Sequence, residues 1–155
     1  MCIRDRFEGG TINTPSMICV EDGLDALNWV ESVGGAKELV NISNQNLKTV
    51  EDWIEKSDNF KFMCEDKNIR SSTSITVQIK DEWFAKHNEE DQRGVLKKLF
   101  SLLEKEGVAN DINGYPKAPP SFRVWAGGTV ESNDIMLLLP WICLLYTSPS
   151  PRDRG

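Results

Sequence analysis

SITVQI, at residues 74–79, decides the class of fold. Ile75, Val77 and Ile79 alternate there with polar residues, and this period of two is typical of a β-strand with one buried face. A second apolar run, FKFMC at residues 60–64, precedes it and is separated from it by the charged segment EDKNIRSS. Two short apolar runs joined by a polar turn predict an antiparallel pair of strands.

Helical patterns lie on both sides of this pair. We predict a first helix with Thr14 as N-cap, Pro15 in its first turn and Gly34-Gly35 at its end. A second helix is predicted from Ala36 to Lys56, with the polar stretch NISNQN on its solvated side. The apolar residues that recur at helical spacing are Met17, Val20, Leu24 and Leu27 in the first helix, and Leu39, Leu47, Val50 and Ile54 in the second.

The C-terminal half continues the alternation of helices and strands. A third helix is predicted from Asp91 to Gly107, followed by a short strand at VANDI (residues 108–112), the loop GYPKAPP and a strand at SFRVWAG. A last helix, capped by Thr129 or Ser132, is predicted to end at Leu139. The third helix faces inward with Val95, Leu96, Leu99, Phe100 and Leu103. The order of elements predicts a small α/β sandwich, a mixed or antiparallel sheet with helices packed on it.

Composition excludes several classes of function. The chain has 155 residues, 39% of them apolar and 27% charged, which is ordinary for a globular protein. Its net charge of -6 and the lack of a basic stripe speak against a nucleic-acid partner. The longest apolar run, Ile135 to Tyr146, is shorter than the roughly 20 residues that span a bilayer. We therefore expect neither a nucleic-acid nor a membrane partner. The four scattered cysteines make the reducing cytoplasm the expected compartment.

The two ends share the tripeptide Arg-Asp-Arg, at residues 4–6 and 152–154. One natural domain has no physical reason to repeat this string at both termini. The ends resemble translated sequencing-adapter peptides, so we expect residues 1–6 and 143–155 to be artefactual.

Ordinary catalytic and metal-binding templates are missing. The sequence has no G-x-S-x-G, no H-E-x-x-H and no Gly-rich loop with a following Lys. Four cysteines without C-x-x-C spacing and a single histidine predict no metal site. His87 lies in a polar connection and is interpreted as a solvated surface residue, whereas Cys19 and Cys64 are expected to be small buried apolar residues.

Features suited to anions remain. Asn13 and Thr14 precede a helix start, where free N–H groups attract a phosphate, although plain N-capping is the alternative. Arg123 lies between Phe122 and Val124 in a strand, and therefore faces away from both. A guanidinium there can hold a carboxylate through two hydrogen bonds, or can simply face solvent.

Two further positive groups are more ambiguous. Lys117 lies in the Pro-rich loop before Arg123, where it can offer a charge or be solvated. Arg70-Ser71 closes a turn into a strand, and can serve structure or face a ligand.

Three segments, in this order, resemble the C-terminal part of the phosphoserine aminotransferase family. They are EGGTINTPSMICVEDGLDALNWVESVGGAKELV (residues 8–40), RSSTS (residues 70–74) and APPSFRVWAGGTVESND (residues 118–134). The family belongs to the fold-type I, class V aminotransferases, which are homodimers with active sites at the subunit interface. The resemblance implies transfer of an amino group between phosphoserine and 2-oxoglutarate through pyridoxal phosphate, in the biosynthesis of serine and of pyridoxal phosphate.

The resemblance also assigns roles to particular residues. Asn13 and Thr14 match the pair that reaches the cofactor phosphate of the neighbouring subunit, and Arg123 matches the arginine that holds the substrate α-carboxylate. The family places a basic residue near the substrate phosphate in the loop before this arginine. Here that place reads Tyr115-Pro116-Lys117, which makes Lys117 the candidate.

The family's Schiff-base lysine, its ring-stacking aromatic residue and the acidic partner of the pyridinium nitrogen all precede this segment. Transamination needs that lysine, so we expect the intact parent to be an enzyme and the chain as printed to be inactive. By the same resemblance, residues 7–34 form the end of the large domain with a linking helix, and residues 35–142 form the small domain. The alternatives are another class V aminotransferase, such as one acting on alanine, and a stand-alone anion-binding α/β domain.

Overall fold

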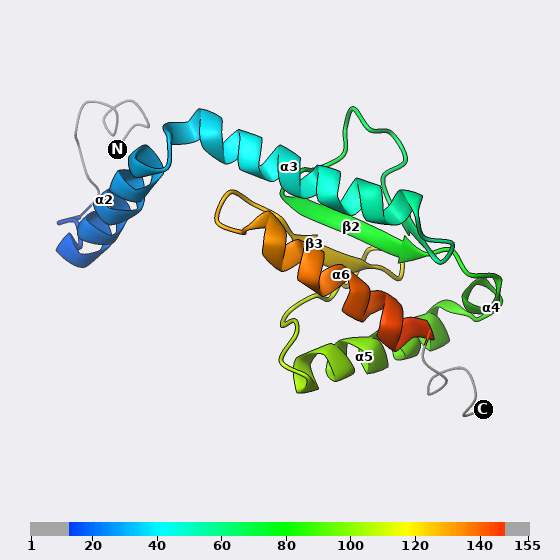
Figure 1. The fold of residues 1–155 in the computed structure, drawn as a ribbon. Coiled ribbons are helices and arrows are strands. Elements are labelled where there is room, and N and C mark those ends of the chain that lie inside the picture. Colours follow the sequence, from blue (N-terminus) through cyan, green and yellow to red (C-terminus); the bar gives the residue numbers. More distant parts are fainter. Residues whose placement is uncertain (1–12, 148–155) are drawn as a thin grey trace. The chain divides into compact units, whose positions relative to one another are not determined.

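The computed structural model describes residues 13–147, drawn in colour in Figure 1. The chain divides into two compact units, one ending at Leu39 and the other beginning at Val40. The first unit contains helix α2 (Met17–Ser32), and helix α3 (Gly35–Glu55) continues from it into the second.

Helix α2 begins later than the sequence predicts. Ser16, with φ -70° and ψ 117°, occupies the N-cap position, so the prediction of Thr14 as N-cap and Pro15 in the first turn is wrong. The fixed φ of proline suits an extended chain as well as a helix, and Pro15 therefore does not by itself place the first turn. The predicted end is confirmed, because Gly34 and Gly35 follow with φ of 111° and 78°.

The apolar residues of α2 are not covered. Met17 and Leu27 are 66% and 62% exposed, and α2 has no buried residue. Cys19 is exposed as well, which contradicts the expectation of a buried cysteine. Helical spacing thus correctly predicted the helix, but spacing alone does not say whether a partner covers its apolar side.

The second unit is built on an antiparallel sheet with the strand order β1-β2-β3. These strands are β1 (Phe60–Phe62), β2 (Ser74–Ile79) and β3 (Phe122–Trp125). The register places Phe60 opposite Ile79, and Thr76 opposite Arg123. The predicted antiparallel pair is therefore confirmed, and Ile75, Val77 and Ile79 of β2 are buried on one face as their alternation indicates.

The strand predicted at residues 108–112 does not form. Asp111 has φ 51°, in the left-handed region, which interrupts an extended run. The segment still approaches β3, because Arg123 donates its backbone N–H to the Ile112 carbonyl over 2.9 Å and Asn113 forms an isolated bridge with Phe122.

Helices differ from prediction mainly at their ends. Helix α5 (Glu89–Lys105) begins before Asp91 because the Asn88 side chain caps it, accepting the N–H of Asp91 over 3.0 Å. The short helix α4 (Glu82–Ala85) was not predicted, and the Asp81 carboxylate caps it. Helix α6 (Ser132–Thr147) does not end at Leu139, and Pro140 lies inside it. None of the helices in residues 13–147 combines the length and the apolar character needed to cross a bilayer.

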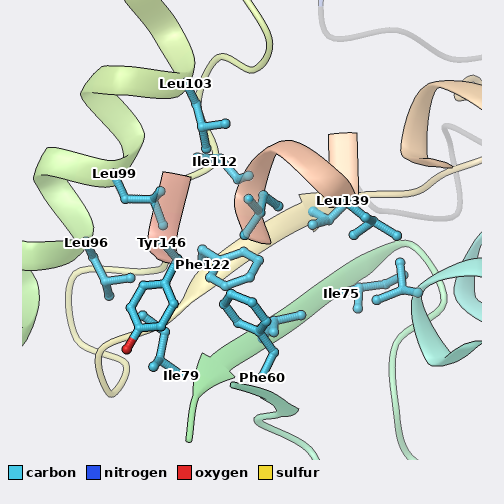
Figure 2. Packing of buried hydrophobic residues seen from close by; sticks show 14 of the residues in the cluster. Phe60, Ile75, Ile79, Leu96, Leu99, Leu103, Ile112, Phe122, Leu139 and Tyr146 are labelled. Atoms are coloured by element: carbon cyan, nitrogen blue, oxygen red, sulfur yellow. The ribbon is translucent and has the colours of Figure 1, made fainter. Parts of the chain in front are cut away.

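The core of the second unit lies between the sheet and helices α3, α5 and α6. Buried residues of all three helices join the inward side chains of the strands in one cluster, shown in part in Figure 2. The Phe60 ring meets the rings of Phe122 and Tyr146 edge to face, with centroids 5.9 and 5.6 Å apart. The helices thus cover one face of the sheet, and the opposite face carries Thr76 and Arg123.

Asn46 of α3 is fully buried, although the polar stretch around it was predicted to face solvent. Its Nδ2 donates to the carbonyls of Ala126 and Val130 over 3.1 and 2.9 Å, and its Oδ1 accepts the Ser132 hydroxyl at 2.6 Å. Ser132 therefore begins α6 bonded to α3 and does not act as the predicted cap. The carbonyls of the turn after β3 need donors, and a buried asparagine supplies them.

Candidate anion-binding site around Arg123

Arg123 lies on the face of the sheet that the helices leave open. It occupies β3 between the buried Phe122 and Val124, and its own side chain is 25% exposed. The prediction that it points away from both neighbours is confirmed, because strand residues alternate between the two faces. A half-buried guanidinium at this position is held by a rigid strand and still reaches solvent.

Two side chains approach the guanidinium. The Tyr115 ring lies under it, with 4.8 Å from the Arg123 Cζ to the ring centroid. Asp111 Oδ2 is 3.6 Å from Nη2, and the Asp111 side chain is 86% exposed. An exposed ion pair at this distance contributes little, so Arg123 keeps donors that can bind an incoming carboxylate.

Tyr115 is also polarised by its surroundings. The nearby Arg123 guanidinium, and after it the Ser74 side chain, lower the pKa of the Tyr115 hydroxyl below its ordinary value of 10.0. Ser74 lies opposite Trp125 in the sheet register, two residues before Thr76 in β2, and therefore on the same face as Thr76 and Arg123. The phenol, the guanidinium and the serine hydroxyl therefore form one polar group on the open face.

Arg123 also lines a cavity of about 490 Å³. Most of its wall is apolar, including Val130 and Ile135, and two carboxylates, Asp111 and Asp134, belong to it. Its described lining holds one guanidinium and two carboxylates, so the cavity as a whole does not favour an anion, and an anion would have to bind at the Arg123 guanidinium itself.

The loop that carries Tyr115 and Lys117 is tied down at several points. A Cβ on Gly114 would lie 2.5 Å from the Ser121 carbonyl oxygen, so no larger residue fits there. The Ala118 N–H donates to the Tyr115 carbonyl over 3.0 Å, and Arg93 of α5 donates to the Ala118 carbonyl over 2.7 Å. These contacts make the loop a firm support for the Tyr115 ring.

Lys117 is exposed in this loop and forms no ion pair among the described residues. It lines neither the cavity at Arg123 nor the neighbouring cavity of about 400 Å³ that Tyr115 borders. Lys117 thus shares a loop with Tyr115, while Tyr115 alone of the two contacts Arg123.

Asn13 and Thr14 belong to the first unit and are exposed just before α2. The Ser16 side chain makes no capping hydrogen bond, so the first backbone N–H groups of α2 are not satisfied by the cap. These N–H groups, the helix dipole and the nearby amide and hydroxyl provide a chemically suitable donor set for a phosphate. The residues present therefore fit the phosphate of a cofactor.

Arg70 has a structural role in this fold, which resolves the ambiguity of its motif. Its Nη1 pairs with Glu51 Oε1 at 2.8 Å, and its Nε donates to the Cys64 carbonyl over 3.1 Å. The guanidinium lies 3.7 Å above the Phe62 ring, and its side chain is only 6% exposed. The following Ser71 hydroxyl accepts the N–H groups of Thr73 and Ser74 in the turn before β2, with no ligand needed to explain it.

His87 is half-buried and packed, not simply solvated. Its Nδ1 lies 2.8 Å from the Trp83 carbonyl oxygen, and its ring tilts against the Trp83 indole with centroids 4.5 Å apart. Within residues 13–147, His, Cys, Asp and Glu do not gather in a group of three that could hold a metal ion.

Sequence reasoning missed Tyr115 and Asp111 as partners of Arg123. Tyr115 was visible only as a member of the Pro-rich loop, and the sequence has no signal that brings this loop under a strand residue. Asp111 was placed in a strand, whereas the left-handed turn at this residue carries its side chain to the guanidinium.

The chain is similar in sequence to two phosphoserine aminotransferases. The chain is 45% identical over 142 residues to the phosphoserine aminotransferase of Methanosarcina barkeri, covering 90% of this chain and 35% of that protein. It is 43% identical over 143 residues to the phosphoserine aminotransferase of Methanosarcina mazei, covering 92% and 36%. No protein-family model matches the chain.

Solved structures show the same fold. A phosphoserine aminotransferase from Bacillus circulans subsp. alkalophilus superposes with a TM-score of 0.70 at 19% identity, over 92% of this chain and 35% of that one. A second phosphoserine aminotransferase, studied for radiation damage of the Schiff base, gives a TM-score of 0.69 at 17% identity, over 86% and 34%. The predicted mixed α/β fold, a sheet with helices packed on it, is therefore confirmed, and the solved phosphoserine aminotransferases share it over the matched part. The chain spans about a third of the length of these relatives, and it is homologous to the C-terminal part of the phosphoserine aminotransferases.

Proposed function

We propose that the full-length protein is a pyridoxal phosphate-dependent phosphoserine aminotransferase. It would convert 3-phosphoserine and 2-oxoglutarate to 3-phosphohydroxypyruvate and glutamate, in the biosynthesis of serine and of pyridoxal phosphate. The observation that carries this proposal is the 45% identity to a phosphoserine aminotransferase. It is supported by the half-buried Arg123, which the resemblance matches to the family's substrate arginine.

Arg123 binds the α-carboxylate that both the amino-acid and the oxo-acid substrates carry. Its guanidinium can donate two parallel hydrogen bonds to a carboxylate, which fixes the plane of the substrate as well as its position. The rigid strand β3 and the packed loop below it hold the donor in place. Lys117 is the candidate for a second contact, to the substrate phosphate.

In this proposal Asn13 and Thr14 hold the cofactor phosphate of a neighbouring subunit, so the active form is a homodimer. The proposed location of the enzyme is the cytoplasm. The support is the exposed donor set before α2, in which the cap leaves backbone N–H groups for an anion. Each subunit would then complete the site of its partner.

Pyridoxal phosphate supplies the electron sink that weakens the bonds to the substrate Cα. The residues of this chain bind and orient the anionic groups at both ends of the reacting pair. The lysine that moves the proton would come from the part of the protein that precedes this segment in its relatives. We therefore propose that the chain as printed binds anions but does not catalyse transamination.

The assay that tests the proposal uses the completed protein, with the chain joined to its own upstream coding sequence. We expect turnover with phosphoserine and 2-oxoglutarate, and much slower turnover with alanine. The alternative, a class V enzyme for a non-phosphorylated amino acid, is favoured by the loop sequence Tyr115-Pro116-Lys117, where the exposed Lys117 lines neither described cavity. A preference for alanine would establish that alternative and overturn the proposal.

A stand-alone anion-binding domain predicts a different result. The 155-residue chain would then bind a small anion tightly and need no cofactor. Calorimetry of the chain with phosphate and with pyridoxal phosphate separates these cases. The aminotransferase proposal would be weakened if the 155-residue chain bound free phosphate with micromolar affinity and the completed protein bound pyridoxal phosphate no more tightly.

A further inference from the structure

Tyr115 contacts the Arg123 guanidinium through the face of its ring, and the family resemblance gives it no role. The ring centroid lies 4.8 Å from the Arg123 Cζ. The guanidinium in turn lowers the pKa of the Tyr115 hydroxyl, which agrees with this close approach. Cation–π attraction restricts the rotamers that Arg123 can adopt.

The support is itself fixed. Gly114 packs so closely on Ser121 that a Cβ would overlap the Ser121 carbonyl oxygen, and the Ala118 N–H closes a turn onto the Tyr115 carbonyl. Arg93 of α5 holds the far side of this turn. A side chain on such a loop stays in place without a ligand, which is what preorganisation of a binding arginine requires.

Asp111 offers Arg123 a competing position. Its carboxylate lies 3.6 Å from Nη2 and is 86% exposed, so the pair is weak as it stands. Without the Tyr115 ring, the guanidinium would be free to swing toward this carboxylate. A guanidinium paired with Asp111 would have fewer donors for a substrate.

We propose that Tyr115 is the positioning residue of the Arg123 site, and that it sets the affinity of the site for the α-carboxylate of both substrates. This inference rests on the function proposed above, because it concerns how that substrate contact is held. The neutral ring orients the guanidinium without neutralising it, whereas a carboxylate in the same place would compete with the substrate.

The first experiment tests the contact in the 155-residue chain without any activity. The chain has two tyrosines, and Tyr146 is buried, so ionisation of Tyr115 can be followed by phenolate absorbance or by NMR. We expect Arg123→Gln to raise the pKa of Tyr115 toward 10.0, because the largest cause of its depression is lost. Ser74→Ala should shift it in the same direction by less, and the exposed Lys98→Gln should leave it unchanged. An unchanged Tyr115 titration in Arg123→Gln would overturn the inference.

The second experiment measures steady-state kinetics of the completed protein. Tyr115→Ala should raise KM for phosphoserine and for 2-oxoglutarate about 10-fold with little change in kcat, and Tyr115→Phe, which keeps the ring, about 3-fold. Adding Asp111→Ala to Tyr115→Ala should restore part of the lost affinity, because the competing carboxylate is gone. The matched control is Ile69→Ala, an exposed apolar residue in another loop.

The two proposals fail in different ways. A completed protein that is inactive with phosphoserine refutes the proposed function, while the tyrosine titration still reports on the contact. An active wild-type protein whose KM values are unchanged in Tyr115→Ala refutes the positioning role alone. A fall in kcat with unchanged KM would also refute it, since a residue that only orients the ground-state contact acts on binding.

Discussion

Two single residues, Arg123 and Asn46, show how one side chain can serve binding and another can serve the stability of the fold. Strand β3 positions Arg123, and the loop that carries Tyr115 supports its guanidinium. The side chain reaches solvent because the helices do not cover this face of the sheet. Asn46 has the opposite character, because it is buried and all of its polar atoms face the protein. The first residue serves binding and the second serves the fold, so their replacements are expected to give different results.

Replacement of Arg123 should affect substrate binding and leave the fold intact. In the completed protein, Arg123→Gln removes a charged donor pair, and we expect kcat/KM for phosphoserine to fall about 10- to 100-fold. The loss should be seen for 2-oxoglutarate too, because both substrates carry the same carboxylate. Lys98→Gln on α5 removes one positive charge far from β3 in the sequence and serves as the control. Equal activity of the two variants would exclude Arg123 from the substrate site.

Replacement of Asn46 should destabilise the second unit. Asn46→Ala leaves the carbonyls of Ala126 and Val130 buried without their donor, and we expect the free energy of unfolding to fall by about 3 kcal/mol. Urea denaturation followed by tryptophan fluorescence measures this loss. Asn44→Ala, an exposed residue on the same helix, is the matched control and should change stability by less than about 0.5 kcal/mol.

At the scale of elements, the helices predicted from the sequence differ from the observed helices mainly in where they begin and end. Asn88 starts α5 earlier than predicted, and Ser16 starts α2 later. The early start of α5 follows from the Asn88 side chain, which accepts the Asp91 N–H, whereas Ser16 makes no side-chain cap and α2 begins where the backbone leaves its extended conformation. Apolar spacing fixes the middle of a helix, and these local bonds fix its ends.

The cap of α5 can be tested directly. Asn88→Ala removes the acceptor of the Asp91 N–H and a second contact at 2.7 Å to the Asp91 carboxylate. We expect a loss of about 1 kcal/mol in the free energy of unfolding, and Asn88→Ser should recover most of it. Thermal melts followed by circular dichroism give the comparison. If Asn88→Ala were as stable as wild type, the cap would not explain the early start of α5.

At the scale of the whole molecule, the two units differ in how much apolar surface they bury. The second unit has a continuous core, while α2 of the first has no buried residue. Several large apolar side chains of α2 are exposed, namely Met17, Ile18, Leu24 and Leu27. An apolar helix side of this kind is typical of a contact surface.

The 155-residue chain should therefore associate in solution. We expect sedimentation velocity at micromolar concentration to show oligomers, and Leu27→Glu to shift the distribution toward monomer. Ile69→Glu, which places the same charge on an exposed loop residue, should leave the distribution unchanged. A monodisperse wild-type monomer that unfolds cooperatively would contradict this expectation.

The sequence alone was enough to predict two strands and the direction of a side chain on one of them, because these features depend on residues close together in the chain. Alternation in SITVQI and SFRVWAG predicted β2, β3 and the outward direction of Arg123, because the period of a strand is a local property. Only the tertiary structure decided the burial of Asn46, whose carbonyl partner Ala126 lies 80 residues away, and the position of the Tyr115 ring under Arg123. Such contacts are made by segments that meet only after packing, and no local pattern of residue types encodes which segments will meet.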